Sequence, residues 1–552
     1  MNARRISLYV VFLAFALILE FWNLSRVPLF EPDEGRYGDI ALTMVKTGDW
    51  LTPKMNYIIH LHKPPLSSWA VATSFKIFGP SEFSARLPGV LLGLIIFLGI
   101  IRLGQFLFNF ETGIAGAWIL LTSTLFLVVT RLLTTDIYLC FFIFLAMSAF
   151  AHLFFGDRHR LAYFYLGMLS MGFGMLTKGP VAWMITIIPF LAFALWKRKR
   201  LNIPLKHWLL ASVLFLLISF GWYLLVMLRQ PGMLNYFLNY QLMQRIGKGA
   251  SGRAHPFYYY LIVLPLGFLP WTVAMPAVVA WFTDRKNVSK DETDKFHFLA
   301  ICFIIPFILF SIFRTKLATY IVPLFPPMAL MAARFWYGLS HKVIPVNRLI
   351  RGTGWVMAAI QILMMCGGII FITLRPKFIE GIQPFYIKAM VGVLIGAAAA
   401  MAIVMFKGKL EWLFRTQVAS LILMSIVGFT ALPDIRYLNT KNFCEKILRL
   451  RHPGDIVMMY ERYFSSPPFY LGERILSVGL PLRETFETKD ELKGFIIEDK
   501  GAIRGLIAGT KRVFILTNQD GYERINSLSR GPIYILLKQN KILLLSNRPE
   551  AS

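Results

Sequence analysis

Long apolar runs, broken by short polar loops, repeat along most of this 552-residue chain. Each run is close to the length of about 20 residues that a helix needs to cross a lipid bilayer. Read with a window of about 19 residues, the pattern predicts about thirteen membrane-spanning helices. They are expected at 6–24, 85–107, 113–130, 136–155, 161–177, 181–196, 208–227, 258–282, 297–313, 320–338, 352–374, 387–407 and 417–433.

The pattern changes after the last apolar run. Short runs rich in β-branched and aromatic residues, bounded by turns, predict strands at 455–460, 512–517 and 532–537. A helix is expected at 443–451. The sequence therefore predicts two domains, a transmembrane domain at 1–433 and a soluble α/β domain at 434–552.

The composition agrees with a polytopic α-helical membrane protein. Hydrophobic residues make up 56% of the chain and charged residues only 16%, which is too apolar for an ordinary soluble protein. The net charge of +28 does not indicate nucleic acid, because basic loops are expected in a membrane protein. The four cysteines show no CxxC or metal-binding spacing, so neither a zinc site nor a disulfide framework is expected.

The basic loops also predict an orientation. With the N-terminus in the cytoplasm, nearly all alternate loops on that side are short and rich in lysine and arginine, including Lys197-Arg198-Lys199-Arg200. The opposite face then carries the long loop 25–84 and, because the number of spans is odd, the C-terminal domain. Trp50, Tyr57 and Trp69 suit a membrane–water interface, so short interfacial helices are expected in this first outer loop.

Ionisable residues gather on the predicted outer face. Asp33, Glu34 and Lys63 lie in the first outer loop, and Asp136 opens the fourth span at its outer end. The outer ends of later spans and the loops between them supply Lys178, Arg245, His255, Lys316 and Tyr320. Carboxylates and cations together on one wet surface suit a reaction that releases an anionic leaving group.

Several motifs resemble those of a known superfamily. The segments EPDEGRY at 31–37, GDWLTP at 48–53 and HKPPL at 62–66 resemble the opening of bacterial membrane glycosyltransferases of the protein-mannosyltransferase-like superfamily, which have the GT-C fold. The segments LTKGP at 176–180 and KLATYIVP at 316–323 look like the aminoarabinose transferase branch, which modifies lipid A. The resemblance implies a bacterial inner-membrane enzyme that uses an undecaprenyl-phosphate-linked sugar and inverts the anomeric carbon.

The resemblance also implies roles for individual residues. Asp33 is expected to orient the acceptor or to accept its proton, with Glu34 and Asp136 as further catalytic carboxylates. Alternatives that need no catalysis are helix caps for Asp33 and Asp136 and a helix N-terminal charge for Glu34. The residues expected to bind donor phosphate or substrate are Arg36, Tyr37, Lys63, Lys178, Arg245, His255, Lys316 and Tyr320.

No cofactor is required by this chemistry, although a divalent metal remains possible. His60 and His62 are spaced by one residue and are the candidate ligands. The aminoarabinose branch usually has an acidic residue where this chain has His62. A metal site built on that carboxylate would therefore lack a ligand here.

The leading prediction is transfer of 4-amino-4-deoxy-L-arabinose from undecaprenyl phosphate to lipid A at the periplasmic face. A protein O-mannosyltransferase, or another enzyme that uses lipid-linked sugars, is the alternative within the same class. A lipid or sugar transporter is the alternative from a different class. Transporters usually place polar groups near the bilayer midplane, whereas the predicted spans here have centres nearly free of charge.

Overall fold

The chain forms two compact units in the computed structural model, which describes residues 3–198, 201–230, 232–236, 254–283, 288–374, 382–434, 439–480, 492 and 495–550. The first unit consists of Met1–Leu24, Pro88–Pro376 and Ile382–Leu432. The second consists of Ser25–Leu87, Lys377–Gly381 and Pro433–Ser552. The first outer loop thus groups with the C-terminal region. The two domains inferred from sequence, 1–433 and 434–552, stay a prediction.

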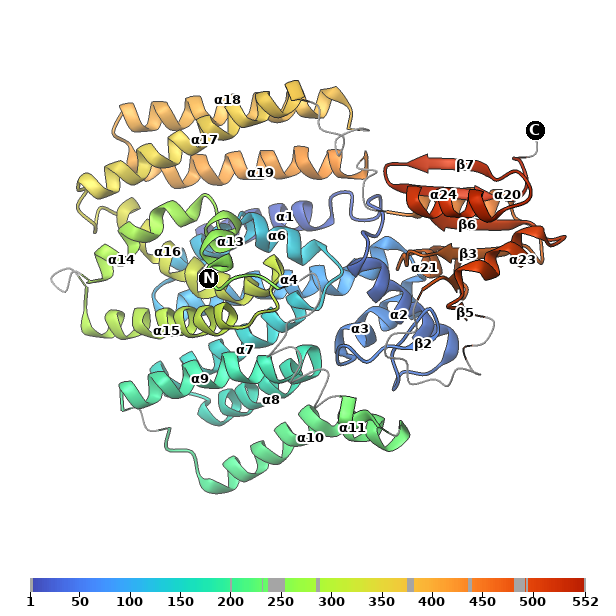
Figure 1. The fold of residues 1–552 in the computed structure, drawn as a ribbon. Helices are drawn as coiled ribbons and strands as arrows, with labels where there is room; N and C mark the ends of the chain where they lie inside the picture. The colour runs from blue at the N-terminus through green and yellow to red at the C-terminus, as the bar shows by residue number, and fades with distance from the viewer. Residues whose placement is uncertain are drawn as a thin grey trace. The chain divides into compact units, whose positions relative to one another are not determined.

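The first unit is built from helices (Figure 1). In chain order they are α1 (Ala3–Phe21), α4 (Glu82–Leu107), which begins in the second unit, α5 (Phe110–Leu121), α6 (Thr124–Arg131), α7 (Asp136–Phe155), α8 (Arg160–Lys178), α9 (Pro180–Trp196), α10 (Leu205–Arg229), α11 (Met233–Asn235), α13 (Tyr259–Gly267), η2 (Trp271–Ala274), α14 (Met275–Thr283), α15 (Lys290–Ile312), η3 (Ala318–Leu324), α16 (Phe325–Ser340), α17 (Arg348–Leu374), α18 (Pro384–Phe406), η5 (Leu410–Trp412) and α19 (Leu413–Ala431).

Every predicted span overlaps helical structure. Among the described residues, seven helices are long and apolar enough to cross a membrane, or up to nine if each of two bent pairs forms one span. The chain is therefore a multi-span membrane protein, and the count of thirteen spans stays a prediction. Many apolar side chains on these helices are exposed, for example Leu228, Leu363 and Phe406, as expected where lipid tails replace water.

Two predicted spans are bent pairs of helices. The α5 and α6 helices meet at 71°, and α13 meets Trp271–Thr283 at 104°. At the first bend, the hydroxyls of Thr122 and Ser123 donate to the carbonyls of Trp118 and Ile119 at 2.6 and 2.7 Å. Such bonds compete with the helical ladder and favour a break. Pro270 lies at the second bend, and it lacks the N–H that a continuing helix would need.

The second unit contains a mixed sheet with helices on its faces and the folded first loop. The loop supplies α2 (Asp33–Thr47), the hairpin β1 (Lys54–Met55) and β2 (Ile58–Ile59), and α3 (Leu66–Phe78). The C-terminal part supplies α20 (Lys441–Leu450), β3 (Ile456–Tyr460), α21 (Pro467–Leu471), β4 (Leu476–Val478), β5 (Ile496–Ile497), η7 (Lys500–Ala502), α23 (Ile503–Ala508), β6 (Val513–Thr517), α24 (Gln519–Leu528), β7 (Tyr534–Gln539) and β8 (Ile542–Ser546). The predicted α/β character of this part is confirmed.

The six-stranded sheet has the order β5-β4-β3-β6-β8-β7. Strands β5, β4, β3 and β6 are parallel, and β8 runs antiparallel to both β6 and β7. Alternate side chains of a strand point to opposite faces. Met459 and Phe514 accordingly pack in one core cluster with Phe443 of α20, while Met458 and Ile515 pack in a second cluster.

Candidate active site

The first turn of α2 begins where the sequence predicted, at Asp33 after Pro32. The cap roles considered for two aspartates are not observed. Pro32 is the N-cap of α2 and Thr135 is the N-cap of α7, and neither makes a side-chain cap bond. Asp33 and Asp136 are each the first residue inside a helix, where negative charge is favoured by the helix dipole.

Glu34 is held in a buried ion pair. Its two carboxylate oxygens accept hydrogen bonds from Arg86 Nε at 2.8 Å and Nη2 at 2.6 Å, and both side chains are no more than 3% exposed. Arg86 also donates to the carbonyls of Val27 and Pro28, and Phe30 N donates to Glu34. This geometry favours a structural role for Glu34, whose catalytic role stays a prediction. Arg86 was not singled out from the sequence.

Glu31 anchors the same loop to the C-terminal region. Its carboxylate accepts hydrogen bonds from Ser465 N at 2.7 Å, Ser466 N at 2.7 Å and Ser466 Oγ at 2.5 Å. Burial raises the pKa of Glu31, although these hydrogen bonds act in the opposite direction. No role for Glu31 was predicted from the sequence. In the sequence, the partners of Glu31 lie in the segment Ser465-Ser466-Pro467-Pro468, which is typical of a helix start.

Asp33 is left nearer the surface than these two acids. Its side chain is 35% exposed and lies 3.3 Å from Arg36 Nη1, whose side chain is 23% exposed. The predicted ligands Tyr37 and Lys63 are half-buried in the same unit. Of the motif's three carboxylates, Asp33 is therefore the best placed to meet a substrate.

Asp39 is a second buried carboxylate of α2. Its oxygens accept hydrogen bonds from Asn56 N at 2.5 Å and from Thr43 Oγ1 at 3.4 Å. Burial raises the pKa of Asp39 to about 7. Asn56 in turn forms two 2.8 Å hydrogen bonds with the backbone of Ile475. Asp39 thus holds the hairpin residue that contacts the C-terminal region.

Three predicted site residues meet in the first unit. Asp136, the first residue of α7, forms an ion pair with Lys178, the last residue of α8, and their side chains are 6% and 5% exposed. The Lys178 ammonium also lies 3.4 Å from the centre of the Tyr320 ring in η3. A cation over an aromatic face is stabilised by the ring quadrupole. This Asp136–Lys178–Tyr320 cluster places a lysine at the end of a membrane helix.

Lys316 occupies a different setting from the one predicted. It is 1% exposed, and its ammonium donates to the carbonyls of His255 at 3.0 Å and Phe313 at 2.5 Å. Desolvation lowers the pKa of Lys316. His255 stacks on Tyr259 with ring centres 4.3 Å apart. Lys316 therefore ties two loops together, and its contact with phosphate stays a prediction. Arg245 lies outside the described residues.

The two histidines considered as candidate metal ligands form a stacked pair. The rings of His60 and His62 have centres 4.1 Å apart and planes at 28°. Within the residues that the structure describes, no group of three or more histidine, cysteine, aspartate or glutamate side chains is arranged to hold a metal ion.

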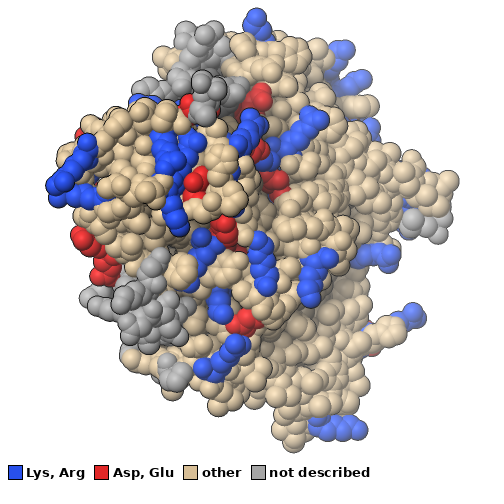
Figure 2. All heavy atoms as spheres, turned by 90° about the vertical axis from the view of Figure 1, so that its right-hand side faces the viewer, with Lys and Arg blue, Asp and Glu red and all other residues tan. Residues whose placement is uncertain are grey.

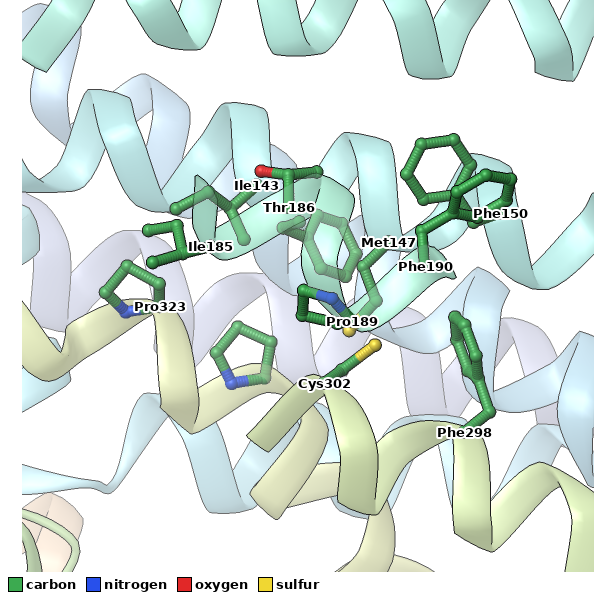
Figure 3. Close-up of a pocket in the computed structure, with 12 residues that line it drawn as sticks. Ile143, Met147, Phe150, Ile185, Thr186, Pro189, Phe190, Phe298, Cys302 and Pro323 are labelled. Atoms are coloured by element: carbon green, nitrogen blue, oxygen red, sulfur yellow. The ribbon is translucent and has the colours of Figure 1, made fainter. Parts of the chain in front are cut away.

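Figure 3 shows an apolar pocket within the first unit. Side chains from α7, α9 and α15, including Met147, Phe190 and Cys302, line a cavity of about 20 Å³. That is space for roughly one water molecule. The residues that line this pocket are mostly apolar, and none of them is charged.

Basic side chains are widespread on the surface. Figure 2 shows lysine and arginine side chains spread across one face, with aspartate and glutamate between them. The whole chain contains 58 lysines and arginines against 30 aspartates and glutamates. Such an excess attracts anionic partners, including lipid phosphates.

Replacing Arg86 tests the buried ion pair. Arg86→Ala leaves Glu34 buried without its cation, which should destabilise the fold by about 3–5 kcal/mol. Arg451→Ala is the matched control, because the side chains of Arg451 and Glu473 are 32% and 41% exposed and such pairs contribute about 0–1 kcal/mol. Thermal unfolding in detergent, followed by size-exclusion chromatography, compares the two. Equal unfolding midpoints for the two variants would contradict the structural role assigned to the Glu34–Arg86 ion pair.

The raised pKa of Asp39 predicts a pH dependence of stability. The folded state keeps the carboxyl proton of Asp39 up to about pH 7, whereas the unfolded chain loses it near the ordinary aspartate pKa of 3.8. This group's contribution therefore falls as pH rises from 3.8 to about 7, by at most about 1.4 kcal/mol per pH unit. In the Asp39→Asn variant, the unfolding midpoint should depend less on pH over this range. An identical dependence on pH in the variant and the parent protein would contradict the raised pKa of Asp39.

Comparison with known proteins shows partial sequence similarity and a shared fold. A family profile described as dolichyl-phosphate-mannose-protein mannosyltransferase matches residues 62–223. An undecaprenyl phosphate-alpha-4-amino-4-deoxy-L-arabinose arabinosyl transferase of Pectobacterium carotovorum subsp. carotovorum is 31% identical over 356 residues. The matched part covers 63% of this chain and 62% of that relative.

Two crystal structures of ArnT from Cupriavidus metallidurans are similar over nearly the whole chain. The apo structure gives a TM-score of 0.79 at 21% identity and covers 99% of both chains. The structure bound to undecaprenyl phosphate gives 0.77 at 21% identity and covers 98% of both. At this identity the likeness establishes the fold. In sequence, the chain is similar to an aminoarabinose arabinosyl transferase over about two thirds of its length, and in fold it is similar to ArnT over nearly all of it.

Proposed function

We propose that this protein transfers 4-amino-4-deoxy-L-arabinose from undecaprenyl phosphate to lipid A at the periplasmic face of a bacterial inner membrane. The observation that carries the proposal is the fold shared over 98% of the chain with a protein solved with undecaprenyl phosphate bound. The name of the Pectobacterium relative supports the choice of sugar. The orientation proposed from the basic loops puts the N-terminus in the cytoplasm and the C-terminal region in the periplasm.

The proposed reaction is a single inverting displacement. An acceptor oxygen forms a bond to the anomeric carbon while the bond from that carbon to the donor phosphate oxygen breaks. The electron pair leaves with undecaprenyl phosphate, which stays anchored in the membrane as an anion. Fixed cations at the boundary of lipid and water would stabilise the charge that develops there.

Lys178 and Asp33 are the central residues of this proposal. Lys178, oriented by Asp136 and Tyr320, is proposed to bind the donor phosphate. Lys63 and Arg36 are proposed as phosphate-binding residues from the sequence motifs that contain them. If the acceptor is a lipid A phosphate, it is already ionised, and Asp33 would position the reacting groups or bind the cationic amino sugar. If the acceptor is a hydroxyl, Asp33 would accept its proton.

A reconstituted transfer assay tests the proposal. Purified protein in liposomes is given undecaprenyl-phosphate-linked aminoarabinose or mannose, with lipid A or a peptide as acceptor, and products are identified by mass spectrometry. Aminoarabinosyl lipid A is the expected product. A mannosylated peptide would favour the second candidate, suggested by the description of the matched family profile. Translocation of the donor without any transfer would overturn the enzyme assignment.

Removing the Lys178 ammonium should lower transfer strongly. Loss of one group that stabilises charge in the transition state typically costs about 10²–10³ in kcat, and we expect this range for Lys178→Ala. Lys197→Ala is the matched control. Lys197 lies after the other end of α9, pairs with Asp294 at 2.7 Å and contacts the ring of Trp196 at 4.3 Å. A comparable loss of transfer rate in Lys178→Ala and Lys197→Ala would show that the loss comes from disturbed structure and not from a missing phosphate contact.

The carboxylate of Asp33 should be needed for turnover. Asp33→Asn keeps the side-chain volume but removes the negative charge and the proton acceptor, so kcat should fall by about 10²–10⁴ if Asp33 is the base. Asp520→Asn is the control, because Asp520 lies in the first turn of α24 in the same unit. Rates are measured with the aminoarabinose donor. Full activity of Asp33→Asn would exclude Asp33 from the site.

A further inference from the structure

We propose that the C-terminal region positions the Asp33 side chain through Ser466, which contacts the α2 segment on both sides of that aspartate in the sequence. The inference rests on the proposed function, because Asp33 is assigned there to the transfer reaction. Ser466 and Glu31 are then positioning residues, since neither needs to touch a substrate. The C-terminal α/β fold becomes part of the catalytic apparatus, although it carries no motif of its own.

The first contact lies before Asp33. Ser466 gives Glu31 two hydrogen bonds, from N at 2.7 Å and from Oγ at 2.5 Å, and Ser465 N gives a third at 2.7 Å. A carboxylate that accepts three hydrogen bonds is fixed in both position and orientation. Only Pro32 separates Glu31 from Asp33, and its ring restricts the backbone between them.

The second contact lies after Asp33. A Cβ atom added at Gly35 would lie 2.6 Å from Ser466 N and 2.8 Å from Ser466 Cα. Glycine is therefore required for α2 to approach the serine backbone this closely. One serine thus contacts both Glu31 and Gly35, and Asp33 lies between them in the first turn of the helix.

Ser466 is itself held in place. Its hydroxyl lies 2.6 Å from Thr440 Oγ1, and both residues are fully buried. Ser466 is also the N-cap residue of α21. Tyr470 in that helix accepts a hydrogen bond from Leu29 N at 2.7 Å. The short helix α21 therefore contacts the incoming loop at both Leu29 and Glu31.

Hydrogen exchange on the full-length protein tests the contact without any substrate. The amides of Glu34 and Gly35 donate to Phe30 O at 3.2 and 3.3 Å. Ser466→Ala should speed their exchange by about fivefold to tenfold, the equivalent of one buried hydrogen bond. Ser546→Ala is the matched control, because Ser546 is buried in β8 and bonds to Arg512 and Arg548. It should leave these amides unchanged.

Kinetics test whether the contact acts through Asp33. We expect Ser466→Ala to lower kcat about tenfold with the donor KM unchanged, as a small misplacement of a reacting group does. Glu31→Gln should give a similar loss, because one acceptor oxygen is replaced by a donor. In an Asp33→Asn background, Ser466→Ala should add no further loss, since the two residues would act as a unit.

The outcomes separate this inference from the proposed function. Unchanged exchange in Ser466→Ala, an equal loss of kcat in Ser546→Ala, or a full additional loss in the Asp33→Asn background would overturn the positioning role. Absence of transfer by the unmodified protein would instead overturn the proposed function. In that case, the exchange rates would still decide whether Ser466 holds the first turn of α2.

Discussion

A carboxylate withdrawn from water must be paired or hydrogen-bonded, and this constraint organises the first outer loop. Glu34 is satisfied by Arg86, Glu31 by Ser465 and Ser466, and Asp39 by Asn56. These partners come from the start of α4, from the turn before α21 and from the β1–β2 hairpin. A segment dense in acids thus becomes rigid because most of its charge is used internally. The Asp33 side chain remains 35% exposed, unlike the buried carboxylates around it.

Sequence patterns predicted the helices well, because long apolar runs need no knowledge of their partners. They did not predict the breaks within 113–130 and 258–282, because a hydropathy window averages over the residues on both sides of a bend. In the sheet, the apolar runs of β3, β6 and β7 were predicted, whereas β4 and β5, with three and two residues, were too short to detect. Asp136 and Lys178 were predicted only to lie on the same face, and the structure adds that they form an ion pair.

The partners of Glu31 and Asn56 could not be predicted in this way. Ser466 follows Glu31 by 435 residues, and Ile475 follows Asn56 by 419. No local pattern specifies such pairs, because they depend on how the α/β fold presents its turns. From sequence, Asp33 and Glu34 of the motif at 31–37 were both expected to be catalytic. The structure distinguishes the members of the motif by burial: Glu34 is buried in an ion pair with Arg86, and Gly35 is buried against Ser466.

The long separation between Glu31 and its serine partners has a consequence for biosynthesis. Ser465 is made 434 residues after Glu31, which takes about 20–90 s at roughly 5–20 residues per second. During that time, the first loop has already left the ribosome but lacks the hydrogen bonds that fix α2. A nascent or truncated chain would thus hold Asp33 in an unsupported loop. The hydrogen bonds that fix the start of α2 therefore form only after the segment that contains Ser465 and Ser466 has been made.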